Sequence, residues 1–374
     1  MRFVSTGEVV EGARLGMDVF GGLSGTVPLL RAGVPLDPRY RRALIEAGID
    51  RVLIDDADSA GIVVVTPLTE VTRQEATQRL EPLLDRSHSI ISRGERVSFD
   101  VIAVASKVAA LVADEVLDSK GEVVTFADGF GAAGYRLQHP IDVTVLGLLI
   151  AQRLFLQHGR IAAGGVRTTN GIEDALRRLS FGLLLHDLGA VDGNEGVRIR
   201  DGLLEQGALA PLSAHTQAGH DALPFSFVSA HAVAAVRSHH EHWDGSGPRG
   251  LAGERIPQFA RIAAVADVFD ALTSSRAGHV PEPANVAVDV IKQAAGTVFD
   301  PQVVEVFLEI VAPFPPGTGV TLSDGSSGIV TDVPSNAMHR PSVRLLRDAT
   351  GTRLQPVEIM LGGSDELTIT AAAA

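Results

Sequence analysis

The sequence predicts a mainly α-helical protein, in which a large all-helical domain is flanked by a small N-terminal α+β module and a small C-terminal β module. Three observations predict this fold class. In the central part of the 374-residue chain, apolar residues recur at intervals of three and four, as on the buried face of a helix. Short apolar strands accompany one well-marked helix before this part. After it the apolar period changes to two, which is typical of strands.

The N-terminal module is predicted for residues 1–67. In its segment VPLDPRYRRALIEAGIDRVLID, Asp37 is placed to cap a helix, Pro38 suits the first helical position and Gly48 suits the end. The letters RVLI that follow predict a strand. We find no cluster of catalytic residue types in this segment.

Residues 68–97 are predicted to form a helical linker, and residues 98–313 the helical domain. The stretches with helical periodicity are VIAVASKVAALVADEVL, IDVTVLGLLIAQRLFL, GIEDALRRLSFGLLLH, FARIAAVADVFDALTS and DPQVVEVFLEIVA. The longest apolar run, residues 143–156, contains Gln152 and Arg153, which favours a buried helix over a membrane span. The Gly-rich stretch GRIAAGGVRTTNG is expected to be a surface connection, because no strand precedes it as a phosphate-binding loop would require.

The C-terminal module is predicted for residues 314–363 as a small antiparallel sheet. Its strands are GVTL, GIVTDV and SVRLLR, with turn signals Asp-Gly at 324–325 and Thr-Gly at 350–351. Residues 364–374, which end in AAAA, are expected to be a frayed tail.

Charge and composition exclude several function classes. The chain has 32 basic and 45 acidic residues, a net charge of −13, so neither a nucleic-acid polymer nor an anionic membrane is an expected partner. It contains no cysteine, which excludes disulfides and thiolate-bound zinc or iron–sulfur sites. The N-terminus does not have the pattern of a signal peptide, so we expect a cytoplasmic protein.

Five histidines and two aspartates of the helical domain lie in apolar surroundings. Each alone is most simply explained as a hydrogen-bonded core residue. Together they would cost about 1–3 kcal/mol each if they were buried without partners, and metal coordination removes that cost. Seven side chains are too many for one ion and suit two ions that share a carboxylate, as in other helical bundles. The candidate ligands are His139, His186, Asp187, His215, His239, His240 and Asp267.

Asp187 is the expected bridging carboxylate, because it directly follows His186 and its side chain is short. A site of imidazoles and carboxylates suits two divalent ions, with iron or manganese expected and zinc as an alternative. Asp270, one turn after Asp267, is placed to orient a ligating histidine from behind.

The helical domain resembles the HD-GYP domain, a branch of the HD metal-dependent phosphohydrolases that is associated with hydrolysis of cyclic di-GMP. Four blocks carry the resemblance: LLLHDLG, a histidine 29 residues after His186, a His-His pair 24 residues further on in HHEHWDGSGPRGL, and RIAAVADVFDALTS. It covers residues 98–313 and implies an HD-type fold. It also implies one metal on His139, His186, Asp187 and Asp267, and a second on Asp187, His215, His239 and His240.

The sequence departs from the family pattern at several positions. The lysine of the HDxGK motif is Ala190 here, and the name-giving Gly-Tyr-Pro is reduced to Gly247-Pro248. Some members hold a third metal with a glutamate one turn before the first histidine. That position is Tyr135 in this chain, so we expect two metals. Arg276 stands where relatives place a phosphate-binding arginine, but the basic residues expected just after it are missing.

The predicted function is a dinuclear-metal phosphodiesterase that hydrolyses cyclic di-GMP, to the linear dinucleotide or to GMP, with metal-activated hydroxide. Asp187 is the expected catalytic residue, which fixes the metal pair and accepts a proton. Arg276, Asp244 and Gly247 are the expected substrate-binding residues, with Arg276 holding a phosphate oxygen by bidentate hydrogen bonds.

Two alternatives stay open on the sequence. The missing lysine and tyrosine favour a receptor or scaffold that binds a cyclic dinucleotide without turnover. A phosphohydrolase acting on another nucleotide or phosphoester is the second alternative. A homodimer or a signalling partner is also left open.

Overall fold

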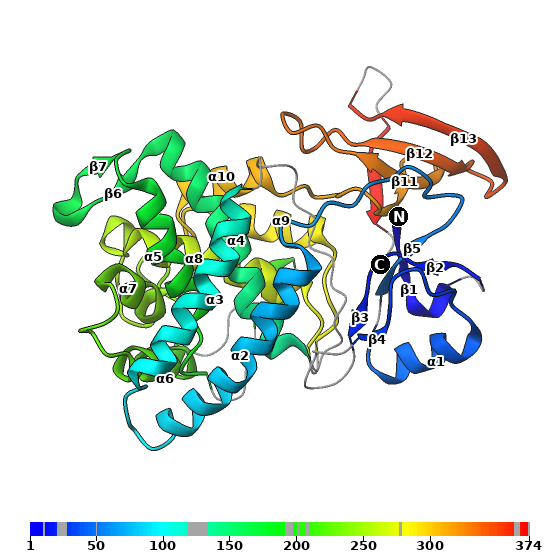
Figure 1. Cartoon of the computed structure of the whole chain (residues 1–374). Coiled ribbons are helices and arrows are strands. Elements are labelled where there is room, and N and C mark those ends of the chain that lie inside the picture. The colour runs from blue at the N-terminus through cyan, green and yellow to red at the C-terminus, as the bar shows by residue number, and fades with distance from the viewer. Residues whose placement is uncertain are drawn as a thin grey trace.

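The computed structural model describes residues 1–9, 12–20, 28–49, 51–118, 134–190, 197–200, 202–205, 209–276, 279–362 and 367–372. They form a helical body, with two smaller sheet-containing modules together on one side of it (Figure 1). The helices are α1 (Pro38–Glu46), α2 (Glu70–Ile91), α3 (Phe99–Asp118), α4 (Tyr135–His158), α5 (Ile172–Leu184), α6 (Leu209–Ala222), α7 (Ala230–Ser238), α8 (Gln258–Thr273), α9 (Ala284–Gln293) and α10 (Pro301–Ile310). The predicted mainly α fold class is confirmed.

The strands lie in the two flanking modules and in two short hairpins of the helical body. They are β1 (Arg2–Ser5), β2 (Arg14–Leu15), β3 (Val19–Phe20), β4 (Pro28–Leu30), β5 (Arg51–Asp55), β6 (Arg160–Ile161), β7 (Arg167–Thr168), β8 (Arg198–Arg200), β9 (Leu203–Glu205), β10 (Gly319–Leu322), β11 (Ser327–Asp332), β12 (Ser342–Arg347), β13 (Arg353–Met360) and β14 (Ile369–Ala372).

The N-terminal module combines α1 with an antiparallel sheet of order β1-β5-β2. Its helix begins as the sequence predicts, because the Asp37 carboxylate accepts hydrogen bonds from the backbone N–H groups of Arg39 (2.8 Å) and Tyr40 (2.9 Å). Gly48 follows the helix with φ at 71°, a conformation that favours glycine. The predicted helix and the strand after it are therefore confirmed.

Helix α4 is the centre of the helical body and packs against α3, α5, α8 and α10 (Figure 1). Ile141, Leu146 and Phe155 are among its fully buried side chains. By length and composition α4 could cross a membrane, but 78% of its apolar window is buried inside the protein. This burial is what the interrupted apolar run predicts for a core helix.

The predicted helical linker is part of the same core. Helix α2 packs against α3 and α4, and its Leu80, Leu83 and Leu84 belong to the hydrophobic cluster that contains α4. Residues 70–91 therefore pack as part of the helical body, and the boundary between linker and helical domain stays a prediction.

The sequence predicts an all-helical domain, and the structure adds two short β-hairpins to its helices. The Gly-rich stretch forms a hairpin of β6 and β7, whose turn contains Gly164 and Gly165 at φ of 82° and 79°. A second hairpin joins β8 and β9. Two consecutive residues with positive φ allow a turn tight enough to close so short a ladder, which hydrophobic periodicity does not reveal.

The C-terminal module is an antiparallel sheet of order β13-β12-β11-β10-β14. The predicted strands over GVTL and SVRLLR coincide with β10 and β12. The expected tail is wrong for residues 369–372, because they form β14 and pair with β10, with Val320 opposite Ala372. Besides the backbone pairing, Leu367 and Ile369 pack against the core of the module, so the alternating letters LTIT were the sequence signal for this edge strand.

The two flanking modules contact each other directly. The backbone N–H of Phe3 donates to the carbonyl oxygen of Gly317 (2.9 Å), and the Arg344 guanidinium donates to the carbonyl oxygens of Asp58 (3.0 Å) and Ala60 (2.8 Å). The ends of the chain are thereby joined into one unit beside the helical body (Figure 1).

Candidate metal centre

The seven predicted ligands come from five separate segments. His139 lies one turn into α4, His215 lies in α6 and Asp267 in α8. His186 and Asp187 lie in the turns just after α5, where the backbone N–H of Ala190 donates to the carbonyl oxygen of Asp187 (2.9 Å). The His-His pair follows the last residue of α7. Helix ends and helix faces thus direct all seven side chains to one place.

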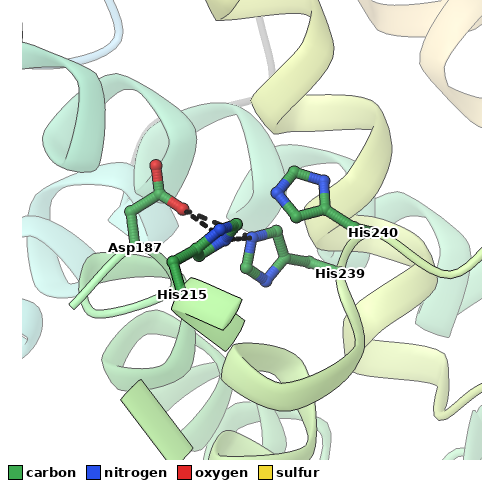
Figure 2. Close-up of side chains that lie close together, drawn as sticks. All are labelled: Asp187, His215, His239 and His240. Carbon is green, nitrogen blue, oxygen red and sulfur yellow. Dashed lines mark hydrogen bonds and ion pairs between the residues drawn. The ribbon is translucent and has the colours of Figure 1, made fainter. Parts of the chain in front are cut away.

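The structure brings these side chains together in two groups. Within each group, one candidate ligand atom of every residue lies within 4.8 Å of the others. The first group is His139, His186 and Asp267, and the second, drawn in Figure 2, is Asp187, His215, His239 and His240.

The first group is deeply buried. The Nε2 atoms of His139 and His186 lie 3.2 Å apart, and Asp267 Oδ1 lies 3.3 Å from the first and 3.7 Å from the second. No side chain of this group is more than 7% exposed. Three atoms that could bind a metal ion therefore face one another away from water.

Asp187 connects the two groups. Its Oδ1 lies 3.4 Å from His215 Nε2 and 3.3 Å from His239 Nε2, as the dashed lines in Figure 2 show. Its Oδ2 lies 3.7 Å from His139 Nε2 and 3.6 Å from His186 Nε2. One carboxylate oxygen therefore faces each group, which is the geometry of a bridging carboxylate.

The hydrogen bonds of four histidines decide which ring nitrogen faces the centre. Each Nδ1–H donates outwards, and the Nε2 lone pairs therefore point inwards. The acceptors are the Leu183 carbonyl oxygen for His186 (2.8 Å), the Pro211 carbonyl oxygen for His215 (3.3 Å), the Ala235 carbonyl oxygen for His239 (3.2 Å) and Asp270 Oδ2 for His139 (2.6 Å).

Converging lone pairs and carboxylates repel one another unless a cation lies between them. Asp187 Oδ1 is buried and accepts no hydrogen bond from the described part of the chain, which leaves a charged oxygen without a donor. Imidazole nitrogens and carboxylate oxygens without thiolates are ligands of divalent iron, manganese and zinc. The residues present therefore fit divalent metal ions.

The charges of the cluster agree with this fit. Burial alone would raise the pKa of Asp187, but the rings of His186, His139 and His239 hold it well below its ordinary value. Burial and the neighbouring His239 lower the pKa of His240 well below its ordinary value. Asp187 is therefore ionised and His240 neutral, as metal ligands must be. Despite burial, the neighbouring Tyr135, Asp187 and Asp267 raise the pKa of His139, and Asp187 and Asp267 raise that of His186, so these two rings must release a proton when a metal ion binds.

Asp187 also marks the solvent side of the cluster. Its side chain is 25% exposed, whereas those of its histidine neighbours are at most 6% exposed. A phosphate group arriving from water would therefore meet the cluster beside Asp187.

Asp270 lies behind the first group. Its Oδ2 accepts the hydrogen bond from His139 Nδ1, and its Oδ1 accepts one from the Ser274 hydroxyl (3.0 Å). A carboxylate in this position fixes the orientation of an imidazole and makes its other nitrogen a better ligand.

Asp270→Asn is expected to weaken metal binding roughly 10- to 100-fold, because the amide carries no charge to support the His139 ring. Titration of metal-free protein with Mn²⁺ measures this affinity. Asp289→Asn is the matched control, since Asp289 is exposed on α9. Equal affinities of the two variants would contradict the role of Asp270.

The structure places the predicted substrate-binding residues in other contacts. The Arg276 guanidinium donates to the carbonyl oxygens of Val197 (2.8 Å) and Ala271, so two of its donors are engaged by the chain itself. Asp244 is exposed, and its Oδ1 accepts the hydrogen bond of the Ser246 backbone N–H (2.8 Å). These contacts shape the protein, and a substrate role of Arg276 or Asp244 stays a prediction.

Gly247 is required by close packing. A Cβ atom at this position would lie 2.5 Å from the backbone nitrogen of His242 and 2.8 Å from the Cα of Glu241.

Glu241 was missed by the sequence reasoning. It is buried and accepts hydrogen bonds from the backbone N–H groups of Arg249 (3.0 Å) and Leu251 (3.0 Å), which folds the loop after His240. The sequence signal that could have identified Glu241 is its position directly after the His-His pair.

Comparison with known families decides what kind of domain carries this cluster. The family model of the HD domain matches residues 205–303, and that of the KOW domain associated with HD domain matches residues 319–372. Residues 205–303 therefore have the sequence of an HD domain. The resemblance inferred from the four sequence blocks is confirmed, and the KOW match extends over β14.

Curated proteins that are similar to this chain carry related names. It is 29% identical over 288 residues, 75% of its length and 67% of the relative's, to the cyclic di-GMP phosphodiesterase response regulator RpfG of Xanthomonas campestris. It is 30% identical over 58% of its length and 49% of the relative's to the cyclic di-GMP phosphodiesterase PA4108 of Pseudomonas aeruginosa. It is 36% identical over 33% of its length and 24% of the relative's to the 3'3'-cGAMP-specific phosphodiesterase 2 of Vibrio cholerae. The chain therefore spans less than half the length of two of these three relatives.

Proposed function

We propose that this protein is a dinuclear-metal phosphodiesterase that hydrolyses cyclic di-GMP to the linear dinucleotide, to GMP, or to both. The observation that carries the proposal is Asp187, which turns one oxygen to each group of candidate ligands. The names of RpfG and PA4108 support the substrate class.

The two groups with Asp187 as their shared member supply the proposed metal ligands. One ion is assigned to His139, His186, Asp187 and Asp267, and the other to Asp187, His215, His239 and His240. Iron or manganese is proposed, with zinc as the alternative. When bound, two divalent ions lower the pKa of a shared water and neutralise phosphate oxygens.

The protein's own residues orient this chemistry. The outward hydrogen bonds of the Nδ1 atoms keep the ligating nitrogens fixed before substrate arrives, so little reorganisation is needed. Asp187 holds the centre of the cluster at its solvent edge, where we propose that its catalytic role is to fix the metal pair. Its low pKa in the metal-free cluster keeps it ionised for the bridging role.

The decisive experiment incubates iron- or manganese-loaded protein with cyclic di-GMP and separates the products by chromatography. We expect the linear dinucleotide or GMP to accumulate, and no product from metal-free protein. Tight binding of cyclic di-GMP to metal-loaded protein with no product would instead identify a receptor. The replacement of the family lysine by the buried Ala190 is the observation that favours this second function.

A different cyclic dinucleotide is the other alternative substrate. The relative named as a 3'3'-cGAMP-specific phosphodiesterase favours it. Competition between cyclic di-GMP and 3'3'-cGAMP in one reaction measures the ratio of their kcat/KM values, and the substrate consumed faster identifies the preference.

We also propose a cytoplasmic location and no polymer or membrane partner. The burial of α4 and the net charge of −13 support this.

A further inference from the structure

We propose that Tyr135 is a positioning residue for His139, and that Arg276 acts on the metal centre through Tyr135. This inference rests on the proposed metal site. Tyr135 is the first residue of α4, and His139 follows it by one turn. Their rings stack with centroids 4.8 Å apart at an interplanar angle of 23°, and the Tyr135 hydroxyl lies 3.1 Å from His139 Nδ1.

Tyr135 is itself held by Arg276. The guanidinium carbon of Arg276 lies 5.5 Å from the centroid of the Tyr135 ring, which is the distance of a cation–π contact. Arg276 is 7% exposed and is fixed by its hydrogen bonds to Val197 and Ala271. A buried, hydrogen-bonded cation on the tyrosine ring is a rigid support.

The start of α4 needs such a support. Gly134 precedes the helix and offers no side chain to cap it, so among the described residues the first turn is held by no N-cap side chain. His139 follows this turn directly. The contact of Tyr135 with Arg276 connects this first turn to the segment after α8.

The stack adds a constraint that Asp270 cannot supply. The hydrogen bond from His139 Nδ1 to Asp270 fixes one edge of the imidazole, but it allows the ring to tilt about that edge. The Tyr135 ring covers a face of the imidazole and limits this tilt. The Nε2 atom is thereby kept 3.2 Å from His186 Nε2 and 3.3 Å from Asp267 Oδ1, where the first ion is proposed.

The test measures metal affinity without substrate. Metal-free protein and its Tyr135→Leu variant are titrated with Mn²⁺, and bound ions are counted by the loss of the free Mn²⁺ spectroscopic signal. We expect Tyr135→Leu to bind one of its two ions roughly 10- to 100-fold more weakly, as for residues that support a metal ligand. Tyr135→Phe keeps the ring and is expected to stay within about threefold of the wild type, because the stack is retained.

The chain offers a matched control and a second variant. It has two tyrosines, and Tyr40, which lies in α1 and is 40% exposed, gives the control Tyr40→Leu. Arg276→Met removes the cation behind Tyr135 while leaving Tyr135 unchanged. It is expected to weaken the same ion as Tyr135→Leu, and it serves as the test if that variant does not fold.

Two results would overturn the inference. Wild-type affinity for both ions in Tyr135→Leu would show that the stack does not position His139. Unchanged Mn²⁺ binding in Arg276→Met, together with weaker binding of cyclic di-GMP, would show that Arg276 acts on substrate directly. Because no turnover is measured, the inference can stand even if cyclic di-GMP is bound but not hydrolysed.

Discussion

Asp187→Asn is expected to lower the turnover of cyclic di-GMP by at least about 10³-fold at saturating metal. Loss of charge stabilisation at a metal centre costs several kcal/mol in the transition state, and each tenfold change in rate corresponds to about 1.4 kcal/mol. Asp187 is singled out because both of its oxygens face histidine nitrogens, one group on each side. The amide keeps the shape of the side chain but removes its charge. The measured quantity is kcat.

Comparing Asp267→Asn with Asp187→Asn distinguishes a ligand of one ion from a carboxylate that bridges two ions. Asp267 faces His139 and His186 of the first group, so its variant should lose one ion and keep the other. Asp187→Asn should instead weaken both ions. Elemental analysis of the two variants gives this comparison, and Asp289→Asn on α9 is the control for loss of a carboxylate charge. Full occupancy by two ions and unchanged kcat in Asp187→Asn would exclude the bridging role.

The sequence revealed the cluster because its chemistry contradicts its surroundings. Histidines and aspartates within apolar stretches such as LSFGLLLHDLG must find partners, and without cysteine or nearby cations a metal is the simplest one. The spacing along the chain does not state which atoms meet. Only the structure shows that Asp187 Oδ1 faces one group of ligands and Oδ2 the other. It also shows that the Nδ1 atoms of two ligating histidines donate outwards to the carbonyl oxygens of Leu183 and Pro211.

The sequence pattern does not predict features that depend on backbone dihedral angles or on contacts between segments far apart in the sequence. The β6–β7 hairpin depends on the φ angles of two glycines, and β14 depends on pairing with β10. Arg276 shows the same limit within the site. Its position in the motif predicts a phosphate ligand, but its contacts with Val197 and Tyr135 involve segments far from it in sequence.

Gly189→Ala is expected to destabilise the protein strongly, by about 3 kcal/mol or more in the free energy of unfolding, at the upper end of the range for overpacked sites. A Cβ atom at this position would lie 2.1 Å from the carbonyl oxygen of His215 and 2.5 Å from the backbone nitrogen of Gly219. Both contacts are with the backbone of α6, so no side chain can rotate to relieve them. Thermal and urea denaturation of metal-free protein measure the loss.

The same substitution should disturb the second group of ligands, because the helix that must move carries His215. We expect weaker binding of Mn²⁺ in any Gly189→Ala protein that folds, since His215 Nε2 would leave its position 3.4 Å from Asp187 Oδ1. Gly7→Ala is the matched control, because a Cβ atom there would meet only Ser5 Oγ at 3.8 Å. If Gly189→Ala matched this control in stability and in metal affinity, α6 could not pack against the turn after Asp187 as closely as the structure shows. The glycine of the LLLHDLG block would then have no steric reason to be there.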